Sequence, residues 1–462
     1  MIVPRIKRNQ HGLWIGLLAS MLTWISCTPD ESYKELLQDN FFLVDANEQL
    51  TEVMVHDIFS PPVASRIYSY PAIAAYEVAV LAEPGTYVSL MGQLKDSEPL
   101  RVSEATTGEP VNYHLAALAA YYKVASKLVF SEQDLIDRRD ALFEKLKDAG
   151  MPAAEFTRAV ELGESVAEQI LAYASADNYH ESRSFEKYTI RDDLGSWRPT
   201  PPAYMEGIEP HWNKIRTFFL DSASQFLPEP PPAFDTVPDS RFFQDAKEVM
   251  DAGNQLNDYQ EEIAYFWDCN PYKMNVKGHV MYAEKKITPG GHWMGITGIA
   301  SKAKGLNWRQ TAEAMCVTSI YLFDAFISCW DEKYRSVLIR PETYINRYMD
   351  EEWTPLLQTP PFPEYTSGHS VISTAASEAL TGLLGEPFYF LDSTEVKYGL
   401  GTREFNSFRE AAEEAAISRF YGGIHYLPAI TNGVDQGRAI ASWIEGRIRT
   451  RKISLAEKAP RR

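Results

Sequence analysis

Residues 367–384 read SGHSVISTAASEALTGLL, and this stretch predicts both a helix and one end of an anion site. Apolar residues recur at helical spacing after Ser367-Gly368-His369, which places these three residues where a helix begins. A helix N-terminus presents free backbone N–H groups and the positive end of the helix dipole. Glycine at position 368 allows the backbone to approach a ligand closely. The stretch therefore predicts a helical protein that holds an anion against a helix end.

The helical period continues through most of the chain, with proline as punctuation and almost no alternating strand pattern. These features predict an all-α protein built as a bundle of packed helices. Between Pro-rich stretches at 198–202 and 228–232, the aromatic region 196–240 is expected to form ordered loops packed on the helices, within one continuous domain. Examples of the expected helices are residues 66–82, 113–129, 131–149, 153–176, 240–268, 308–329, 369–384, 407–421 and 433–450.

The N-terminus has the pattern of a bacterial export signal. Three cationic residues precede an apolar run at 13–25 that is too short to span a bilayer, and Ile25-Ser26-Cys27 resembles a lipoprotein processing site. We therefore expect a signal peptide over 1–26, lipidation of Cys27, a polar tether over 27–45, the all-α domain over 46–452 and a polar tail over 453–462. The expected location is outside the cytoplasm, periplasmic or at the cell surface, with the lipid as the link to the membrane. Ordinary secretion and an uncleaved anchor are the alternatives.

Charge and cysteine content exclude some classes of function. The formal charge of -18 argues against non-specific nucleic-acid binding, because phosphate contacts need clustered Lys and Arg. Beyond Cys27, the cysteines are Cys269, Cys316 and Cys329, without a C-x-x-C pair or a nearby histidine cluster. Their spacing argues against structural zinc, and leaves buried thiols or one disulfide as the alternatives. There is also no G-x-x-x-x-G-K nucleotide loop.

Three segments near the C-terminus carry cations and imidazoles in a fixed order. They are Lys333-x6-Arg340-Pro341, Ser367-Gly368-His369 and Ser418-Arg419-x5-His425. Pro341 predicts a helix end just after Arg340, and Gly422-Gly423 predicts a turn that brings His425 back toward the other segments. A buried trianionic oxyanion must be met by positive charge and by hydrogen-bond donors. The segments together therefore predict a pocket for a tetrahedral oxyanion such as phosphate or vanadate.

In residue types and order, the three segments resemble the signature of the vanadium-dependent haloperoxidase and type 2 phosphatidic acid phosphatase superfamily. The signature region runs over about 330–440. The resemblance to bacterial haloperoxidase-like proteins extends over roughly 46–450. It includes SPPVASRIYSYPAIAAYEVAV at 60–80, SWRPTPPAY at 196–204, IAYFWD at 263–268 and GGHWMGI at 290–296.

The resemblance implies a role for each residue of the signature. Lys333, Arg340 and Arg419 would bind the equatorial oxygens of a vanadate cofactor, with the Ser367 hydroxyl and the Gly368 amide. His425 would be the axial ligand of vanadium, and His369 the acid–base residue. Hydrogen peroxide and a halide would be the substrates, hypohalous acid the product, and a small organic molecule the final acceptor. Trp330 and Phe362 would wall the halide site, although ordinary core packing is an equal alternative for both.

Two other functions stay open at the level of sequence. In the phosphatase branch, the same pocket would hold a phosphoryl group, with His425 as nucleophile and His369 protonating the leaving alcohol. The third alternative is a non-catalytic exported lipoprotein that binds a glycan or a partner through its 25 Tyr and 10 Trp residues. An oligomer is compatible with the sequence, and halide preference cannot be read from it.

One position departs from the family pattern. The family usually has aspartate four residues after the second histidine, where this chain has Ala429. We expect Asn432, Asp435 or the backbone to orient His425 instead, since orientation by a second group strongly affects metal affinity. Asp268 is a candidate partner for an arginine of the site, and His292-Trp293 a candidate entrance.

Overall fold

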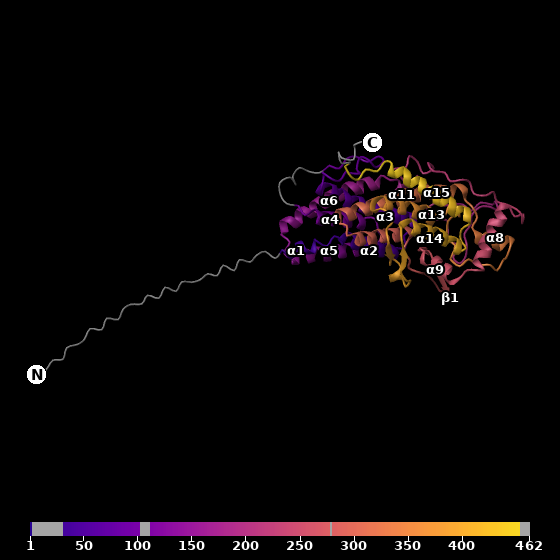
Figure 1. Cartoon of the computed structure of the whole chain (residues 1–462). Coiled ribbons are helices and arrows are strands. Elements are labelled where there is room, and N and C mark those ends of the chain that lie inside the picture. The colour runs from indigo at the N-terminus through magenta and orange to yellow at the C-terminus, as the bar shows by residue number, and fades with distance from the viewer. Residues whose placement is uncertain (2–30, 102–110, 278–279, 453–462) are drawn as a thin grey trace, which may run out of the picture.

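The computed structural model describes residues 1, 31–101, 111–277 and 280–452, and the protein is mostly helical, as predicted (Figure 1). The first group of helices is α1 (Ser32–Leu36), α2 (Phe42–Asp57), α3 (Pro61–Ala82), α4 (Tyr113–Ser126), α5 (Glu132–Asp148), α6 (Ala153–Ser175) and α7 (Tyr179–Ser182). The second group is α8 (Arg241–Gly253), α9 (Asp258–Phe266), α10 (Pro289–Lys304), α11 (Trp308–Ser336), α12 (Pro341–Tyr348), α13 (Gly368–Leu384), α14 (Phe408–Tyr421) and α15 (Leu427–Glu445). Short 3₁₀ helices η2 (Trp212–Lys214) and η3 (Val396–Tyr398) lie in connecting loops.

The described residues contain four short strands in two antiparallel pairs. Strand β1 (Met274–Lys277) pairs with β2 (Val280–Ala283), with Met274 opposite Ala283. Strand β3 (Phe390–Asp392) pairs with β4 (Arg403–Phe405), with Phe390 opposite Phe405. Each pair is a local hairpin in a connection between helices, so neither forms a sheet layer.

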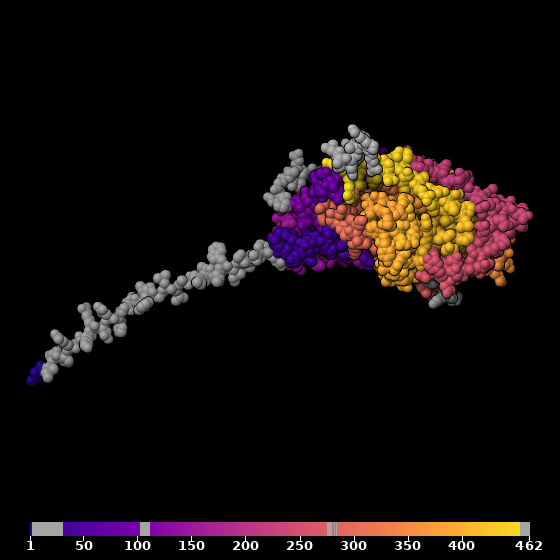
Figure 2. Space-filling view, in the orientation of Figure 1, coloured from indigo at the N-terminus to yellow at the C-terminus, as the bar shows by residue number. Residues whose placement is uncertain are grey.

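The helices form two bundles that meet along α3 and α11. Helices α1, α4, α5 and α6 lie toward one end of the elongated molecule, α3 lies near its middle, and α8, α9 and α14 lie toward the other end (Figure 1). Helix α11 packs on α3 of the first bundle and on α13 of the second. One hydrophobic core runs from Tyr33 to Ile444 through both bundles. On the face seen in Figure 2, orange and yellow C-terminal segments cover the middle of the molecule, and pink segments from the middle of the chain cover the end where α8 and α9 lie.

Helix α11 is the central element of the core. An Asn307–Gln310 capping box starts it, and 24 of its residues are buried along its 29-residue length. This helix is long and apolar enough to cross a membrane, but its most apolar stretch is entirely buried inside the protein. Its apolar character is therefore explained by packing between the two bundles.

The start of α13 is fixed by close packing against α15. The Ser367 hydroxyl caps α13 by accepting a hydrogen bond from the Ser370 amide, and the Ser367 amide donates to the Ala429 carbonyl. At Gly437 a Cβ would lie 2.4 Å from the Val371 carbonyl oxygen, so a side chain there would force the helices apart. This glycine contact sets the position of the signature residues at the start of α13.

The loops over 196–240 are ordered, as expected. Trp212, Phe218 and Phe219 are buried against the helices. The buried carboxylate of Asp324, on α11, accepts hydrogen bonds from the backbone amides of residues 218, 219 and 220. These bonds satisfy backbone groups that a loop would otherwise leave buried without partners.

Several sequence expectations need correction. The described part of the expected tether is folded: α1 and the start of α2 lie in it, with Tyr33 bonded to Ala149 and Leu43 fully buried. Pro341 begins α12 and Arg340 is its N-cap, so the proline starts a helix instead of ending one. The expected helix over 240–268 is two helices, and α1, α2, α7, α10 and α12 lie outside the ranges named from the sequence. The signal peptide, Cys27 and the tail over 453–462 lie outside the described residues.

Candidate active site

Residues of the second and third signature segments line one pocket between α11, α13 and α14, and the first segment lies behind it. Gly368 and His369 contribute from the start of α13, Arg419 from the last turn of α14, and His425 from the loop after it. Gly423 has φ +74, which makes the turn after α14 and returns His425 to the pocket. The residues that line the pocket are Pro61, Cys269, Asn270, Pro271, Tyr272, Pro289, Phe326, Trp330, Pro360, Phe362, Gly368, His369, Arg419, Ile424 and His425.

Behind this pocket lie the other two cations of the signature. Lys333 and Arg340 are fully buried, and Arg340 Nη1 lies 3.1 Å from His425 Nε2. Lys333 Nζ donates to the carbonyls of Pro363, Glu364 and Thr366, which uses all three of its donors. In this arrangement, Lys333 contributes charge to the pocket and no free N–H group.

Positive charge accumulates here without a paired carboxylate. Among the described residues, Lys333, Arg340 and Arg419 have no carboxylate oxygen within 4.0 Å of their side-chain nitrogens. Burial therefore lowers the pKa of Lys333 to about 7 and that of Arg340 to about 10, and it lowers the pKa of Arg419 as well. Burying three cations with so little compensation is costly unless an anion binds among them.

Glu364 orients His425, which sequence reasoning did not anticipate. Since a guanidinium can only donate, His425 Nε2 accepts from Arg340 and Nδ1 carries the proton. Nδ1 donates to Glu364 Oε1 at 2.8 Å, and the same oxygen accepts from the Tyr426 amide. Burial raises the pKa of Glu364 to about 7, against the pull of Arg340 and Lys333. The imidazole is thus held with the Nε2 lone pair facing the cations.

The side chains expected to orient His425 in place of the missing aspartate contact other residues instead. Ala429 is fully buried, Asn432 donates to the Tyr365 hydroxyl, and Asp435 pairs with Arg438 at the surface. The sequence carried a signal for Glu364, because this acid, three residues before the signature serine, interrupts an apolar stretch between Pro363 and Tyr365.

His369 faces the pocket with one nitrogen free. Its ring hydrogen-bonds to the backbone of Trp267, whose carbonyl also accepts from Arg419 Nη1 at 2.7 Å. His369 Nε2 is buried and has no partner. Burial and the nearby Arg419 hold the pKa of His369 well below its usual range, so the imidazole is neutral near pH 7. A neutral, oriented imidazole with a free nitrogen is suited to accepting a proton.

Trp330 and Phe362 form an aromatic wall, with ring centroids 5.0 Å apart. Lys333 Nζ lies 5.1 Å from the Phe362 ring centroid and the Arg340 guanidinium 5.0 Å from it. The wall therefore separates the buried cations from the rest of the pocket. Tyr272, which the sequence did not single out, lines the same pocket.

The other two expectations from sequence are resolved by burial. Asp268 is buried, but its hydrogen bond goes to Lys286 at 2.8 Å, and toward Arg419 it acts through charge alone. His292 and Trp293 are fully buried and are absent from the pocket lining, so they do not form its entrance.

The donors left over in this region match a tetrahedral oxyanion. Arg340 Nη2 and Arg419 Nε are buried donors without a hydrogen-bond partner among the described residues, and the unpartnered His369 Nε2 beside them is an acceptor. A Cβ at Gly368 would lie 3.8 Å from the Trp330 ring, an ordinary van der Waals contact, so the glycine faces the aromatic side of the pocket. Unpaired cations, free donors and a helix N-terminus together form an anion cradle. The residues present therefore fit vanadate or phosphate.

Comparison with known proteins identifies the family. The model of the VCPO second helical-bundle domain matches residues 313–451. A crystal structure described as the first bacterial vanadium-dependent iodoperoxidase is 48% identical, with a TM-score of 0.84, over 89% of this chain and 97% of that one. No curated protein matches the sequence.

Two crystal structures of bacterial vanadium-dependent chloroperoxidase share the fold. The holo-type structure is 18% identical with a TM-score of 0.61, and covers 84% of this chain and 93% of that one. The apo-type structure is 19% identical with a TM-score of 0.63, over 84% and 94%. Given the 48% identity over nearly the full length of the iodoperoxidase, the chain belongs to the vanadium-dependent haloperoxidase family, whose members are peroxidases with a vanadate cofactor.

Proposed function

We propose that this enzyme oxidises iodide with hydrogen peroxide and releases hypoiodous acid, with the pocket between α11, α13 and α14 as its active site. The observation that carries the proposal is the set of three buried cations without a paired carboxylate, next to two oriented imidazoles. The 48% identity to an iodoperoxidase supports iodide as the halide. No feature of the described residues favours the phosphatase or the non-catalytic alternative.

In this proposal, the cations and the start of α13 hold the cofactor. Arg340 Nη2 and Arg419 Nε supply free donors for oxygens, and Lys333 supplies charge from behind the pocket. The Ser367 hydroxyl continues to accept from the Ser370 amide as the helix cap, and it donates its own proton to the bound oxyanion, as the neighbouring Gly368 amide does. His425 would bind the vanadium through Nε2, the atom that accepts from Arg340 Nη1 in this structure. When bound, vanadate supplies a Lewis acid centre that activates peroxide without changing its oxidation state.

His369 acts as the acid–base residue. Its free Nε2 accepts a proton from incoming hydrogen peroxide, and the bond to the Trp267 backbone keeps the ring aimed at the pocket. The same nitrogen later returns the proton to a leaving oxygen. A positioned imidazole of this kind contributes about 10²–10⁴-fold to a rate.

The aromatic wall favours a weakly hydrated halide. Trp330, Phe326 and Phe362 give the pocket an apolar side, so an entering halide loses water there without gaining hydrogen bonds. This loss is least costly for iodide, the largest of the three common halides, since the cost of burying an ion falls as its charge is spread over a larger radius.

The test is a halide series on the vanadate-loaded enzyme with hydrogen peroxide. Triiodide absorbance reports iodide oxidation, and halogenation of a phenolsulfonephthalein dye reports the oxidation of bromide or chloride. We expect kcat/KM for iodide to exceed that for bromide by more than about 100-fold, the discrimination that roughly 2.7 kcal/mol of barrier gives. Equal efficiency with bromide would contradict the iodide assignment. Hydrolysis of p-nitrophenyl phosphate without peroxide, as the main activity, would instead point to a phosphatase.

We also propose that Cys27 carries a lipid that anchors the enzyme outside the cytoplasm. The support is the N-terminal sequence pattern alone. Labelled palmitate should be incorporated into the wild-type chain and not into Cys27→Ala, and the variant should move from the membrane to the soluble fraction. Palmitate labelling of Cys27→Ala would exclude this anchor.

A further inference from the structure

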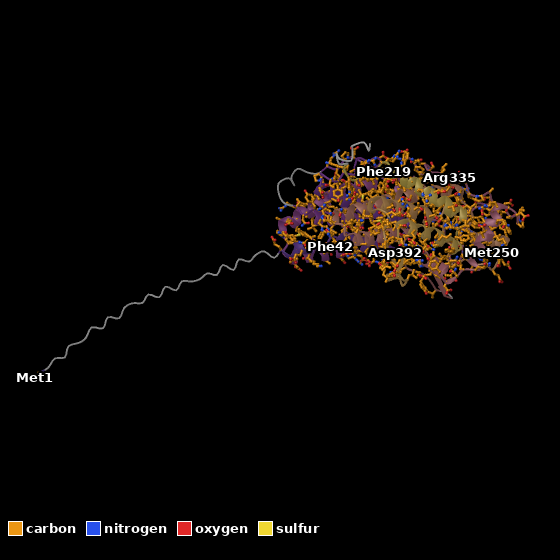
Figure 3. The ribbon with its side chains drawn as sticks, in the orientation of Figure 1. Met1, Phe42, Phe219, Met250, Arg335 and Asp392 are labelled. Atoms are coloured by element: carbon orange, nitrogen blue, oxygen red, sulfur yellow. The ribbon has the colours of Figure 1, made fainter. Side chains whose placement is uncertain are left out.

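A second polar cluster lies beside the active site and has no part in the proposed reaction. Its members are Cys269 in the loop after α9, His292 in the first turn of α10, Asp392 at the end of β3 and Glu395 just before η3. All four are buried, and His292 and Asp392 are fully so. Asp392, labelled in Figure 3, marks its place in the molecule.

Three potential ligand atoms of this cluster face one another in a triangle. Cys269 Sγ lies 3.4 Å from His292 Nδ1 and 3.7 Å from Glu395 Oε1, and Nδ1 and Oε1 are 3.3 Å apart. Tetrahedral zinc bonds of about 2.0–2.3 Å place N, O and S ligand atoms about 3.3–3.6 Å from one another. The triangle therefore matches three corners of a tetrahedral site without any movement beyond about 0.2 Å.

His292 is held in the orientation that a metal ligand requires. Its Nε2 donates to Asp392 Oδ2 at 2.8 Å, and Asp392 Oδ1 in turn accepts from the amide and hydroxyl of Thr394. The imidazole also stacks on Trp267 with ring centroids 4.3 Å apart. These contacts fix the ring, so Nδ1 must face Cys269 and Glu395. A carboxylate behind a ligating histidine is a recurring support of metal sites.

Charge also favours a cation at this point. With no cation present, the two carboxylates and the sulfur all face one imidazole. To limit the buried negative charge, the sulfur must then keep its proton as a thiol, and the imidazole must carry a proton on Nδ1 as well as on Nε2. A divalent cation replaces these two protons and leaves the net charge of the cluster unchanged, so binding releases two protons. We propose that Cys269, His292 and Glu395 bind one divalent cation of the zinc class, with Asp392 as the residue that positions His292. Thiolate, imidazole and carboxylate together select zinc over magnesium or calcium.

The cluster has an entry path and a structural consequence. Cys269 lines the active-site pocket, so a cation can reach the sulfur from there, and a water can fill the fourth position from the same side. The cation would join the loop after α9 to α10 and to the β3–η3 turn. It would thereby brace Trp267, whose carbonyl holds both Arg419 and the His369 ring.

The test uses the full-length chain, stripped with chelator and then incubated with Zn²⁺ or Co²⁺. After gel filtration, we expect one Zn²⁺ per wild-type chain. The Co²⁺ form should show a near-ultraviolet thiolate-to-metal band and intense visible bands typical of tetrahedral coordination. Cys269→Ala should lose the thiolate band, and its Zn²⁺ affinity should fall at least tenfold. Cys316→Ala is the matched control, because Cys316 is equally buried but belongs to no such cluster; it should behave like wild type.

A second measurement does not depend on variants folding. Anomalous diffraction from wild-type crystals, above and below the zinc edge, should show one peak inside the triangle of Sγ, Nδ1 and Oε1. Retention of Zn²⁺ by Cys269→Ala at wild-type affinity would overturn the proposal. The proposal would also be overturned if the wild-type chain bound no Zn²⁺, or if the anomalous signal appeared only at positions outside this triangle.

Discussion

The oxyanion pocket and the Cys269–His292–Glu395 cluster adjoin each other along the segment 267–269, yet their charges are opposite. The pocket buries Lys333, Arg340 and Arg419 without a paired carboxylate, whereas the cluster buries two carboxylates and a thiol around one imidazole. Because burying an unmatched charge is costly, each region indicates a ligand of the sign that it lacks. The type of donor atom then identifies the ligand: N–H groups select an oxyanion, and sulfur, nitrogen and oxygen lone pairs select a metal cation.

The largest expected effect separates the two imidazoles of the pocket. His425→Ala should retain only background vanadium, since it removes the axial ligand. His369→Ala should keep the metal and lose about 10²–10⁴-fold in kcat, because it removes the acid–base group alone. Vanadium analysis after gel filtration, paired with the iodide assay, measures both. Equal vanadium contents in wild type and His425→Ala would refute the axial role.

Glu364→Gln tests whether the pocket recognises vanadium through an oriented histidine or merely binds anions. The substitution removes the charge that polarises His425 Nδ1–H but keeps the size of the side chain. Vanadate affinity should fall by about 10–100-fold relative to phosphate affinity, because phosphate needs no bond to His425. Competition binding gives the ratio of the two affinities. Asp435→Asn, at the surface, is the control. An unchanged ratio would show that Glu364 has no such role.

Asp392→Asn tests the independence of the two regions. Asparagine still accepts from His292 Nε2 but without a negative charge, so Zn²⁺ affinity should fall about tenfold, the lower end of the range for such partners. Vanadium content should stay at the wild-type level, because Asp392 touches no residue of the pocket signature. Loss of vanadium together with Zn²⁺ would show that one region cannot form without the other.

The smallest expected effect is a pH dependence of anion binding. The Lys333 pKa is about 7 in the folded chain against an ordinary 10.5, because burial disfavours the charged form. Between these values the unfolded chain binds more protons, so this group makes the free energy of unfolding rise with pH from about 7 to 10.5. Below about 7 the folded chain carries the buried charge and gains most from an anion.

Sulfate is the suitable probe, since it stays dianionic across this range. It should raise the Tm by more at pH 6 than at pH 9. Lys333→Met, which keeps the volume and removes the charge, should abolish the difference. Equal Tm gains for wild type at both pH values would mean that Lys333 does not govern anion binding.

The helical period predicted the long helices because each of them buries one apolar face, and the apolar residues of that face recur at regular spacing within a single short segment. It failed where tertiary contacts override local pattern. Helix α10 contains GGHWMGI, whose glycines and aromatics obscure the helical period, and it is stabilised by its Thr288 cap and by burial against its neighbours. The tether failed for the same reason, since Tyr33 and Leu43 are buried against helices far along the chain.

The family, the all-α fold and the candidate residues of the oxyanion site could be read from the order of amino acids alone, because segment order and helix caps are local properties. Only the tertiary structure decided how those residues are held. It brought Glu364 behind His425, the Trp267 carbonyl under His369 and Arg419, and Cys269 beside His292 and Glu395. The physical reason is that orientation and charge balance depend on atoms within about 3–4 Å of each other, a distance that the chain reaches by packing and that spacing along the sequence does not encode.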